Sequence, residues 1–286
     1  MFGVIEAGGT KMICAVGNEN LEVKDQARFN TRGPVETFAD IKKFFAKYKE
    51  VLKSIAIGSF GPIDVDPYSD DYGKILNTPK EAWKDFNIVK CLEEDFNLPI
   101  FLTTDVNASA YGEYKIGRGK GKKSLAYYTV GTGVGGGVVQ NGEFIGGAGH
   151  PEMGHMIINK DSNDSYEGGC MCHKACLEGL ASGPNIEKRL STRAENLDPN
   201  DEFWDIEANY LAQAAYNTSL MFSPEVIVFG GGVMQVPVLI EKIREKFKDL
   251  MNGYMDLPDL DSYIVRPEYD GKSATYGLLI LAQEIL

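Results

Sequence analysis

The chain has 286 residues, of which 43% are hydrophobic and 24% charged, and its formal net charge is −12. This length and composition are normal for a soluble globular protein of about two domains. The acidic balance argues against nonspecific binding to nucleic acid or anionic membrane, which needs a basic face. No apolar run approaches the roughly 20 residues that cross a bilayer.

The chain's opening and its cysteines indicate a reducing compartment. Residues 1–5 show neither the charged start nor the long apolar segment of a signal peptide. The five cysteines are an odd number and cluster beside histidines. We therefore expect a cytoplasmic protein whose cysteines bind metal, in preference to a disulfide-bonded one.

The first part of the chain alternates strand, turn and helix patterns. Residues 2–5 and 12–16 predict a hairpin around the glycine-rich tip EAGGTK, and residues 36–51 carry apolar side chains at helical spacing. A strand, a helix, a strand, a helix and a second glycine-tipped hairpin are then expected over residues 54–62, 84–96, 99–105, 107–117 and 124–139.

The rest of the chain is mostly helical after a stretch rich in cysteine and histidine. Residues 224–234 predict a strand that ends in a glycine loop, and helices are expected over residues 177–190, 204–222, 238–251 and 273–286. The alternation of strands and helices indicates an α/β fold. The likeness between the two glycine-tipped hairpins suggests a duplicated unit, which predicts a pair of related lobes.

Three glycine-rich turns are candidate phosphate sites. They are GGTK at residues 8–11, the hairpin tip at residues 131–137 and GGG at residues 230–232. Backbone N–H groups of such turns bind anions, and a threonine hydroxyl and a lysine add donors. One such turn alone is more simply a tight hairpin, whereas three favour phosphate binding. Neither a Walker loop nor a helix-opening Rossmann fingerprint occurs.

Asp105 stands between an apolar strand and a helix. A carboxylate at that junction lies at the edge where α/β folds bind ligands. It can serve simply as a helix cap. The functional alternative is a general base that orients a substrate hydroxyl and takes up its proton as a phosphoryl group arrives.

All three histidines and three of the five cysteines lie in one short stretch that begins with HPEMGH. Cys170, His173 and Cys176 are spaced C-x2-H-x2-C, and His155 lies upstream. Four N/S ligands fit a closed structural zinc site. Cys172 competes with His173 for the fourth position. A metal-dependent hydrolase is disfavoured because four closed ligands leave no site for water.

Two carboxylates flank this stretch, Glu152 and Glu178. A metal would pin the loop that carries Glu152 against the helix that carries Glu178. Both side chains would then face one pocket and accept hydrogen bonds from vicinal hydroxyls, so a polyol is the expected ligand.

Seven motifs resemble, in order, those of the ROK sugar kinases of the actin-like ATPase superfamily, and among them the bacterial fructokinases. They span nearly the whole chain: EAGGTK, SFGP, DVNASAYGE, VGTGVGGG, HPEMGH, CMCHKACLE with GLASGP, and FGGGVM. The resemblance implies two actin-like (ribonuclease H-like) lobes with an active-site cleft between them, and a homodimer. The expected N-terminal lobe is residues 1–105 with helix 273–286 packed back on it, and the C-terminal lobe is residues 106–272 with a zinc-binding insertion at residues 150–178.

The resemblance also implies a reaction, the ATP- and Mg²⁺-dependent phosphorylation of a hexose 6-hydroxyl with Asp105 as the catalytic residue. The positions that match the ATP-binding motifs are Gly8, Gly9, Thr10, Lys11, Thr132, Gly133, Gly135, Gly231 and Gly232. Those that match the sugar-binding motifs are Gly61, Pro62, Asp105, Glu152, His155 and Glu178. The implied zinc ligands are His155, Cys170, His173 and Cys176, with Cys172 the alternative to His173.

Fructose is the expected hexose. The first loop starts with Glu6, as in the fructokinase branch, and Thr104 stands where the family's glucokinases have asparagine. Glucose, mannose or an N-acetylhexosamine is the alternative substrate. A sugar-sensing regulator is a remote alternative, because such regulators resemble this chain with a DNA-binding extension in front, for which the loop at Glu6 leaves no room.

Overall fold

The computed structural model describes residues 1–78, 80–147 and 149–286. Each of its two compact units contains a five-stranded sheet, which confirms the α/β class. One unit comprises Met1–Gly112, Gly146–His150 and Lys272–Leu286, and the other Glu113–Ile145 and Pro151–Gly271. The division thus falls after Gly112, whereas the sequence placed the lobe boundary at Asp105.

The sheet of the first unit has the strand order β3-β2-β1-β4-β5. β1, β2 and β3 form an antiparallel meander, and β4 and β5 continue the sheet parallel to β1. The bounds are β1 Phe2–Ala7, β2 Lys11–Gly17, β3 Val23–Asn30, β4 Ser54–Ser59 and β5 Ile100–Thr104.

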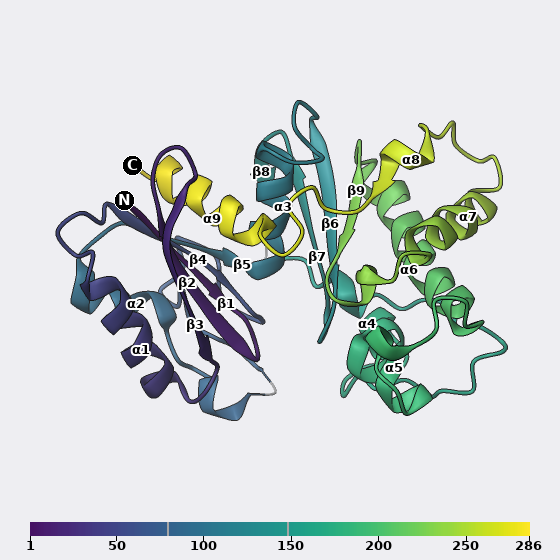
Figure 1. Ribbon diagram of the computed structural model, residues 1–286, viewed down its shortest axis with the longest axis horizontal. Coiled ribbons are helices and arrows are strands. Elements are labelled where there is room, and N and C mark those ends of the chain that lie inside the picture. The colour runs from purple at the N-terminus through teal and green to yellow at the C-terminus, as the bar shows by residue number, and fades with distance from the viewer. Residues whose placement is uncertain (79, 148) are drawn as a thin grey trace. The chain divides into compact units, whose positions relative to one another are not determined.

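Helices cover both faces of this sheet. α1 (Pro34–Ala46) and α2 (Ile88–Phe96) lie on one face, and α9 (Ser273–Glu284) lies on the other (Figure 1). α1 contributes Phe38, Ile41 and Phe45 to a fully buried core with the apolar side chains of β1 and β4. The helix that follows β5 is α3 (Asp105–Lys115), and a short 3-10 helix, η1 (Glu81–Trp83), precedes α2.

α3 and α9 touch through their glycines. A Cβ placed on Gly112 would lie 2.1 Å from the Ser273 carbonyl oxygen, and one on Gly277 would lie 1.9 Å from the Ala108 carbonyl oxygen. Both distances are far below van der Waals contact, so only glycine allows the two backbones to approach this closely. This contact keeps the start of α3, and therefore Asp105, with the first unit.

We expect Gly277→Ala to lower the free energy of unfolding by about 1–3 kcal/mol, because the new methyl group forces the two helices apart. A glycine-to-alanine change in an exposed helix stabilises a protein by up to ~1 kcal/mol. The sign of the change in unfolding free energy therefore shows whether the two helices are in close contact at Gly277. Thermal unfolding of both proteins measures the effect, and an unchanged or higher Tm would contradict the close contact.

The sheet of the second unit has the order β10-β9-β6-β7-β8. β6 and β7 form the second glycine-tipped hairpin, and β9 pairs with β6 in parallel. The bounds are β6 Ser124–Val130, β7 Val134–Gln140, β8 Glu143–Phe144, β9 Ile227–Gly230 and β10 Ile264–Val265.

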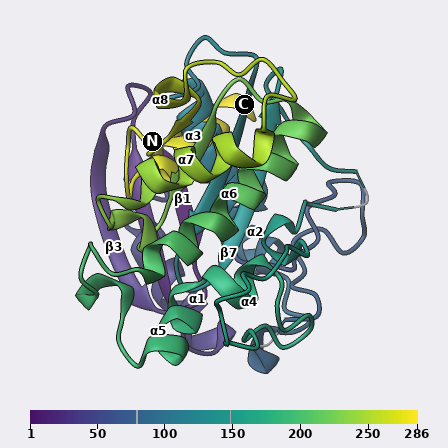
Figure 2. The same ribbon diagram turned by 90° about the vertical axis from the view of Figure 1, so that its right-hand side faces the viewer.

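Five helices belong to the second unit, and α6 packs against α7 along its length (Figure 2). The bounds are α4 Leu177–Ala181, α5 Gly183–Leu190, α6 Phe203–Phe222, α7 Leu239–Met251 and α8 Leu260–Tyr263. The core contains Trp204, Tyr210 and Phe247 at zero exposure. No helix in the described part of the chain is long and apolar enough to cross a membrane.

Several elements differ in extent from those expected, and others were missed. The helix predicted over residues 177–190 is two helices, α4 and α5, because Ser182 is extended (φ −73, ψ 150) and Pro184 starts a new helix. The helix predicted over residues 36–51 ends at Ala46. β3 was missed because it is a polar edge strand with alternating exposure.

Candidate active site and metal centre

Three loops leave the first sheet at the same edge. Ala7 pairs with Ser59, and Ser59 with Thr104, across the parallel strands β1, β4 and β5. Neighbouring strands lie about 4.8 Å apart, so the residues after each strand start side by side. The structure therefore gathers one edge group that contains Gly8, Gly9, Thr10, Lys11, Gly61, Pro62 and Asp105.

Asp105 is the first residue of α3, but Thr104 caps the helix. The Thr104 Oγ1 accepts the Asn107 N–H at 3.1 Å, which is the bond that a cap makes to the third residue of a helix. The Asp105 Oδ1 accepts the N–H of Val106 at 2.8 Å. Because Thr104 already makes the capping bond, helix capping does not account for a carboxylate at position 105.

The first glycine loop is held by backbone contacts. The Gly8 N–H donates to the Lys11 carbonyl at 3.0 Å, and a Cβ on Gly8 would lie 2.8 Å from that oxygen. The Thr31 hydroxyl donates to the Gly8 carbonyl at 2.7 Å, and the Thr31 N–H donates to the Thr10 carbonyl at 3.1 Å. The loop is a preformed turn in which residues 9 and 10 form the tip.

Glu6 lies at the base of this loop. Burial raises the pKa of its carboxyl group, while a hydrogen bond from the Thr275 hydroxyl and the charge of Lys11 act in the opposite direction. The hydrogen bond from Thr275 therefore connects the Glu6 side chain to α9.

Lys80 is a cation at this loop that the sequence did not single out. Its Cε lies 3.3 Å from the position a Cβ on Gly9 would take. The Lys80 carbonyl accepts the Trp83 N–H at 2.7 Å, and the Trp83 indole N–H donates to the Arg32 carbonyl at 2.8 Å. The sequence around Lys80 does not indicate that this residue lies near Gly9. The contact depends on the packing of Trp83, which holds the segment that carries Lys80.

Two loops of the second unit also meet at one sheet edge. The hairpin tip closes with the Gly131 N–H on the Gly133 carbonyl at 2.9 Å. Gly231 has φ +98, and a Cβ there would lie 2.4 Å from the Val130 carbonyl oxygen, so only glycine fits. A Cβ on Gly131 would lie 3.9 Å from the Gly232 nitrogen. This edge brings together Thr132, Gly133, Gly231 and Gly232, and Gly135 follows within β7.

Glu178 reaches the same hairpin tip. Its Oε2 accepts the Val134 N–H at 3.0 Å, and a Cβ on Gly133 would lie 2.6 Å from that oxygen. The turn η2 (Met153–His155) packs over the start of β7, where a Cβ on Gly154 would collide with the Val134 carbonyl oxygen at 1.7 Å. The segments that carry Glu152, His155 and Glu178 therefore surround the first residue of β7.

His155, Cys170, His173 and Cys176 form one cluster whose ligand atoms all lie within 4.8 Å of one another. The His155 Nδ1 lies 3.7 Å from the Cys170 Sγ and 3.6 Å from the Cys176 Sγ, and the His173 Nδ1 lies 3.8 Å from the Cys170 Sγ. In a tetrahedral zinc site the bond lengths place N and S ligand atoms about 3.6 Å apart. The donor set and its spacing therefore fit zinc.

The arrangement of the side chains favours His173 over Cys172 as the fourth ligand. Both residues are exposed, but only His173 has a ligand atom in the cluster. Burial is the main cause that raises the pKa of the Cys176 thiol to about 11. A thiolate is thus disfavoured at this buried position unless a cation compensates its charge, as a bound metal does.

The candidate site residues fall into two groups, one on each compact unit. The first group consists of Asp105 and the other residues at the edge of the first sheet. The second group consists of the hairpin tip, Glu178 and the Cys/His cluster. An active-site cleft that joins the two groups stays a prediction.

Comparison with known proteins agrees with the motifs. The model of the ROK family matches residues 2–285. A fructokinase of Streptococcus mutans is 50% identical over 100% of this chain and 98% of its own length, and one of Lactococcus lactis subsp. cremoris is 45% identical over 99% and 97%. The crystal structure of a ROK hexokinase from Thermus thermophilus matches with a TM-score of 0.81 at 25% identity, over 98% of this chain and 97% of that one. The predicted actin-like fold class is thereby confirmed.

Proposed function

The chain belongs to the ROK family, and we propose that it is a fructokinase that transfers a phosphoryl group from ATP to the 6-hydroxyl of fructose. The similarity to fructokinases over the full length of both chains, at 50% and 45% identity, is the observation that carries the proposal. Asp105 lies at the sheet edge where α/β folds bind ligands, and Thr104 rather than Asp105 caps the helix. Both observations support the catalytic assignment of Asp105.

Asp105 accepts the proton of the sugar hydroxyl as the phosphoryl group arrives. The glycine turns on the two units and Lys11 hold the phosphates through N–H groups and a positive charge. Mg²⁺, which enters with ATP, offsets the charge of the transferring group. Catalysis of this kind consists mainly of positioning and electrostatic stabilisation, so the preformed turns are the protein's main contribution.

The sugar is held by Glu152, Glu178 and His155. Carboxylates accept hydrogen bonds from adjacent hydroxyls, and the Glu178 carboxylate lies against the hairpin tip that binds phosphate. The His155 Nδ1 faces the two cysteine sulfurs, which leaves Nε2 as the nitrogen directed to the sugar. His155, Cys170, His173 and Cys176 would hold Zn²⁺, which supplies a structural cross-link between the loop of His155 and α4.

A coupled assay tests the reaction. Fructose, ATP and Mg²⁺ are supplied together with phosphoglucose isomerase and glucose-6-phosphate dehydrogenase, so that only fructose 6-phosphate yields NADPH. We expect NADPH formation that requires the isomerase. ADP release without NADPH would mean phosphorylation at another hydroxyl, and no ADP release with any hexose would refute the kinase assignment.

Lys80 adds a second positive charge beside the first glycine loop. We expect Lys80→Ala to raise KM for ATP about tenfold, equivalent to ~1.4 kcal/mol, because a charge-assisted bond to a phosphate is lost. Lys84→Ala is the matched control, since that exposed lysine follows η1 and lies on the same segment. Equal KM values in the two variants would remove Lys80 from the nucleotide site.

A homodimer in the cytoplasm completes the proposal. Family membership supports the dimer, and a cluster of free thiols with metal-ligand spacing supports a reducing compartment. Light scattering of the purified protein tests the dimer.

A further inference from the structure

Glu178 is carried by a helix that cannot fix its own orientation. α4 has five residues, Leu177–Ala181. The first four N–H groups and the last four carbonyl groups of any helix lack partners within it, so almost every backbone group of α4 must find a partner elsewhere. Whatever binds these groups decides how α4 is rotated, and therefore where the Glu178 carboxylate points.

Two side chains of the next helix bind the carbonyl groups of α4. The Asn185 Nδ2 donates to the Glu178 carbonyl at 3.0 Å, and the Arg189 Nη2 donates to the Leu180 carbonyl at 3.0 Å. Residues 185 and 189 are four apart on α5, which places both side chains on one face of that helix. α5 thus holds α4 at two points.

Asn185 is itself fully engaged. Its Nδ2 also donates to the Ser182 Oγ at 2.8 Å, and its Oδ1 accepts the Tyr166 hydroxyl at 2.9 Å. A Cβ on Gly169 would lie only 1.8 Å from the Asn185 Oδ1. The residue is 5% exposed, and its side chain has no space to turn.

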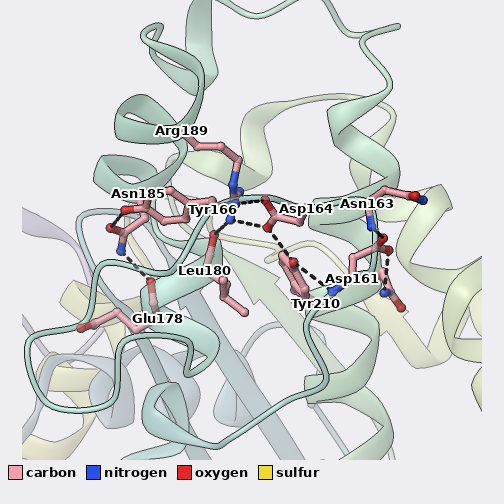
Figure 3. A network of polar contacts seen from close by, with 10 residues as sticks. Asp161, Asn163, Asp164, Tyr166, Glu178, Leu180, Asn185, Arg189 and Tyr210 are labelled. Atoms are coloured by element: carbon pink, nitrogen blue, oxygen red, sulfur yellow. Dashed lines mark hydrogen bonds and ion pairs between the residues drawn. The ribbon is translucent and has the colours of Figure 1, made fainter.

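The network continues into the segment between the two halves of the metal cluster. The Arg189 guanidinium pairs with Asp164 at 3.0 Å, with side-chain exposures of 8% and 3%, and lies 4.8 Å above the Tyr166 ring. The Tyr210 hydroxyl donates to the same Asp164 at 2.7 Å. Figure 3 shows two groups of contacts that end on the backbone of α4. Tyr210 and Asp164 lead through Arg189 to the Leu180 carbonyl, and Tyr166 leads through Asn185 to the Glu178 carbonyl.

We propose that Asn185 is a positioning residue that aims the Glu178 carboxylate at the sugar. This rests on the proposed function, in which Glu178 binds a sugar hydroxyl. The Glu178 carbonyl accepts two hydrogen bonds, one from the Ser182 N–H at 3.1 Å and one from the Asn185 Nδ2 at 3.0 Å, and the latter ties it to a side chain of α5. The Val134 N–H holds one carboxylate oxygen at 3.0 Å. The other carboxylate oxygen is thereby oriented for the substrate.

A double-mutant cycle between Asn185→Ala and Glu178→Gln tests the proposal, with kcat/KM for fructose as the measured quantity. Glu178→Gln keeps the backbone carbonyl that Asn185 binds. We expect Asn185→Ala to lower kcat/KM about 10- to 100-fold in the wild-type background, since small misplacements of a binding group cost that much. In the Glu178→Gln background it should lower kcat/KM less than about twofold.

If Asn185 had only a structural role, Asn185→Ala would lower kcat/KM by the same factor in both backgrounds. That additive result would overturn the proposal. Tyr166→Phe is the second variant, because it removes only the donor to the Asn185 Oδ1. It should lower kcat/KM about threefold when Glu178 is present and leave kcat/KM unchanged in the Glu178→Gln background, by the same coupling argument. A Tyr166→Phe effect of equal size in both backgrounds would also contradict the proposal.

Asn209→Ala is the matched control. Asn209 on α6 donates a hydrogen bond to Asp161 of the same segment at 3.2 Å. We expect the kcat/KM of Asn209→Ala to stay within about twofold of wild type, because this bond does not involve Glu178 or Asn185. If the wild type phosphorylates fructose but the effects of Asn185→Ala and Glu178→Gln are additive, only the positioning role of Asn185 is overturned and the proposed function stands. A wild type that prefers another hexose moves the cycle to that sugar, and one that phosphorylates no hexose overturns both proposals.

Discussion

Asp105→Asn lowers kcat by about 10³-fold, within the range that general-base catalysis contributes. The amide has nearly the same shape as the carboxylate but cannot accept the proton of the sugar hydroxyl. The fold should survive, because Thr104 makes the capping bond to Asn107 and the amide oxygen can still accept the Val106 N–H. Fructose binding, measured by calorimetry, should change less than about threefold, since the amide oxygen can still accept a hydrogen bond from the sugar hydroxyl and only the proton transfer is lost.

Asp85→Asn is the control for this substitution. Asp85 has φ +65 and a 67% exposed side chain, and asparagine tolerates that left-handed conformation equally well. Its kcat should match the wild type. If Asp105→Asn retained more than about a tenth of the wild-type kcat, Asp105 would not be the general base.

We expect Cys176→Ser to abolish zinc binding at the proposed site and to lower Tm by roughly 5–10 °C, because a structural zinc contributes its binding free energy to folding. Cys176 is fully buried, and its Sγ lies 3.6 Å from the His155 Nδ1. Loss of the metal should also lower kcat/KM for fructose, since the cross-link between the loop of His155 and α4 disappears. Metal analysis, thermal unfolding and the coupled assay measure the three effects.

Cys172→Ser is the matched control, because Cys172 is exposed and lies outside the cluster. We expect one zinc per chain and an unchanged Tm in that variant. Loss of metal from Cys172→Ser with retention in His173→Ala would mean that the fourth ligand has been misassigned. A chelator that abolished activity without lowering Tm would argue against a structural metal.

Local sequence patterns predicted most of the elements that carry the site. GGTK between two apolar runs marked the first hairpin, and an apolar strand that ends at Thr104 marked the sheet edge at which Asp105 stands. These patterns depend on neighbours in the chain, so they can be read directly. The break between α4 and α5 was missed although Pro184 signals it, because the apolar spacing continues across it.

Contacts between distant residues could not be predicted in this way. Lys80 reaches Gly9 only because a buried tryptophan holds its segment, and Asn185 reaches Glu178 only because α5 folds back on α4. The fourth ligand of the cluster is a similar case. Cys172 and His173 both had acceptable spacing, and the fold placed only His173 with the other three.

The central claim is that this ROK kinase prefers fructose. It is tested most directly by kcat/KM with ATP and Mg²⁺ for fructose, mannose, glucose and the N-acetylated hexosamines, all measured by ADP release under one condition. We predict the highest kcat/KM for fructose, by at least about tenfold. A higher kcat/KM for glucose, mannose or an N-acetylhexosamine would contradict the account.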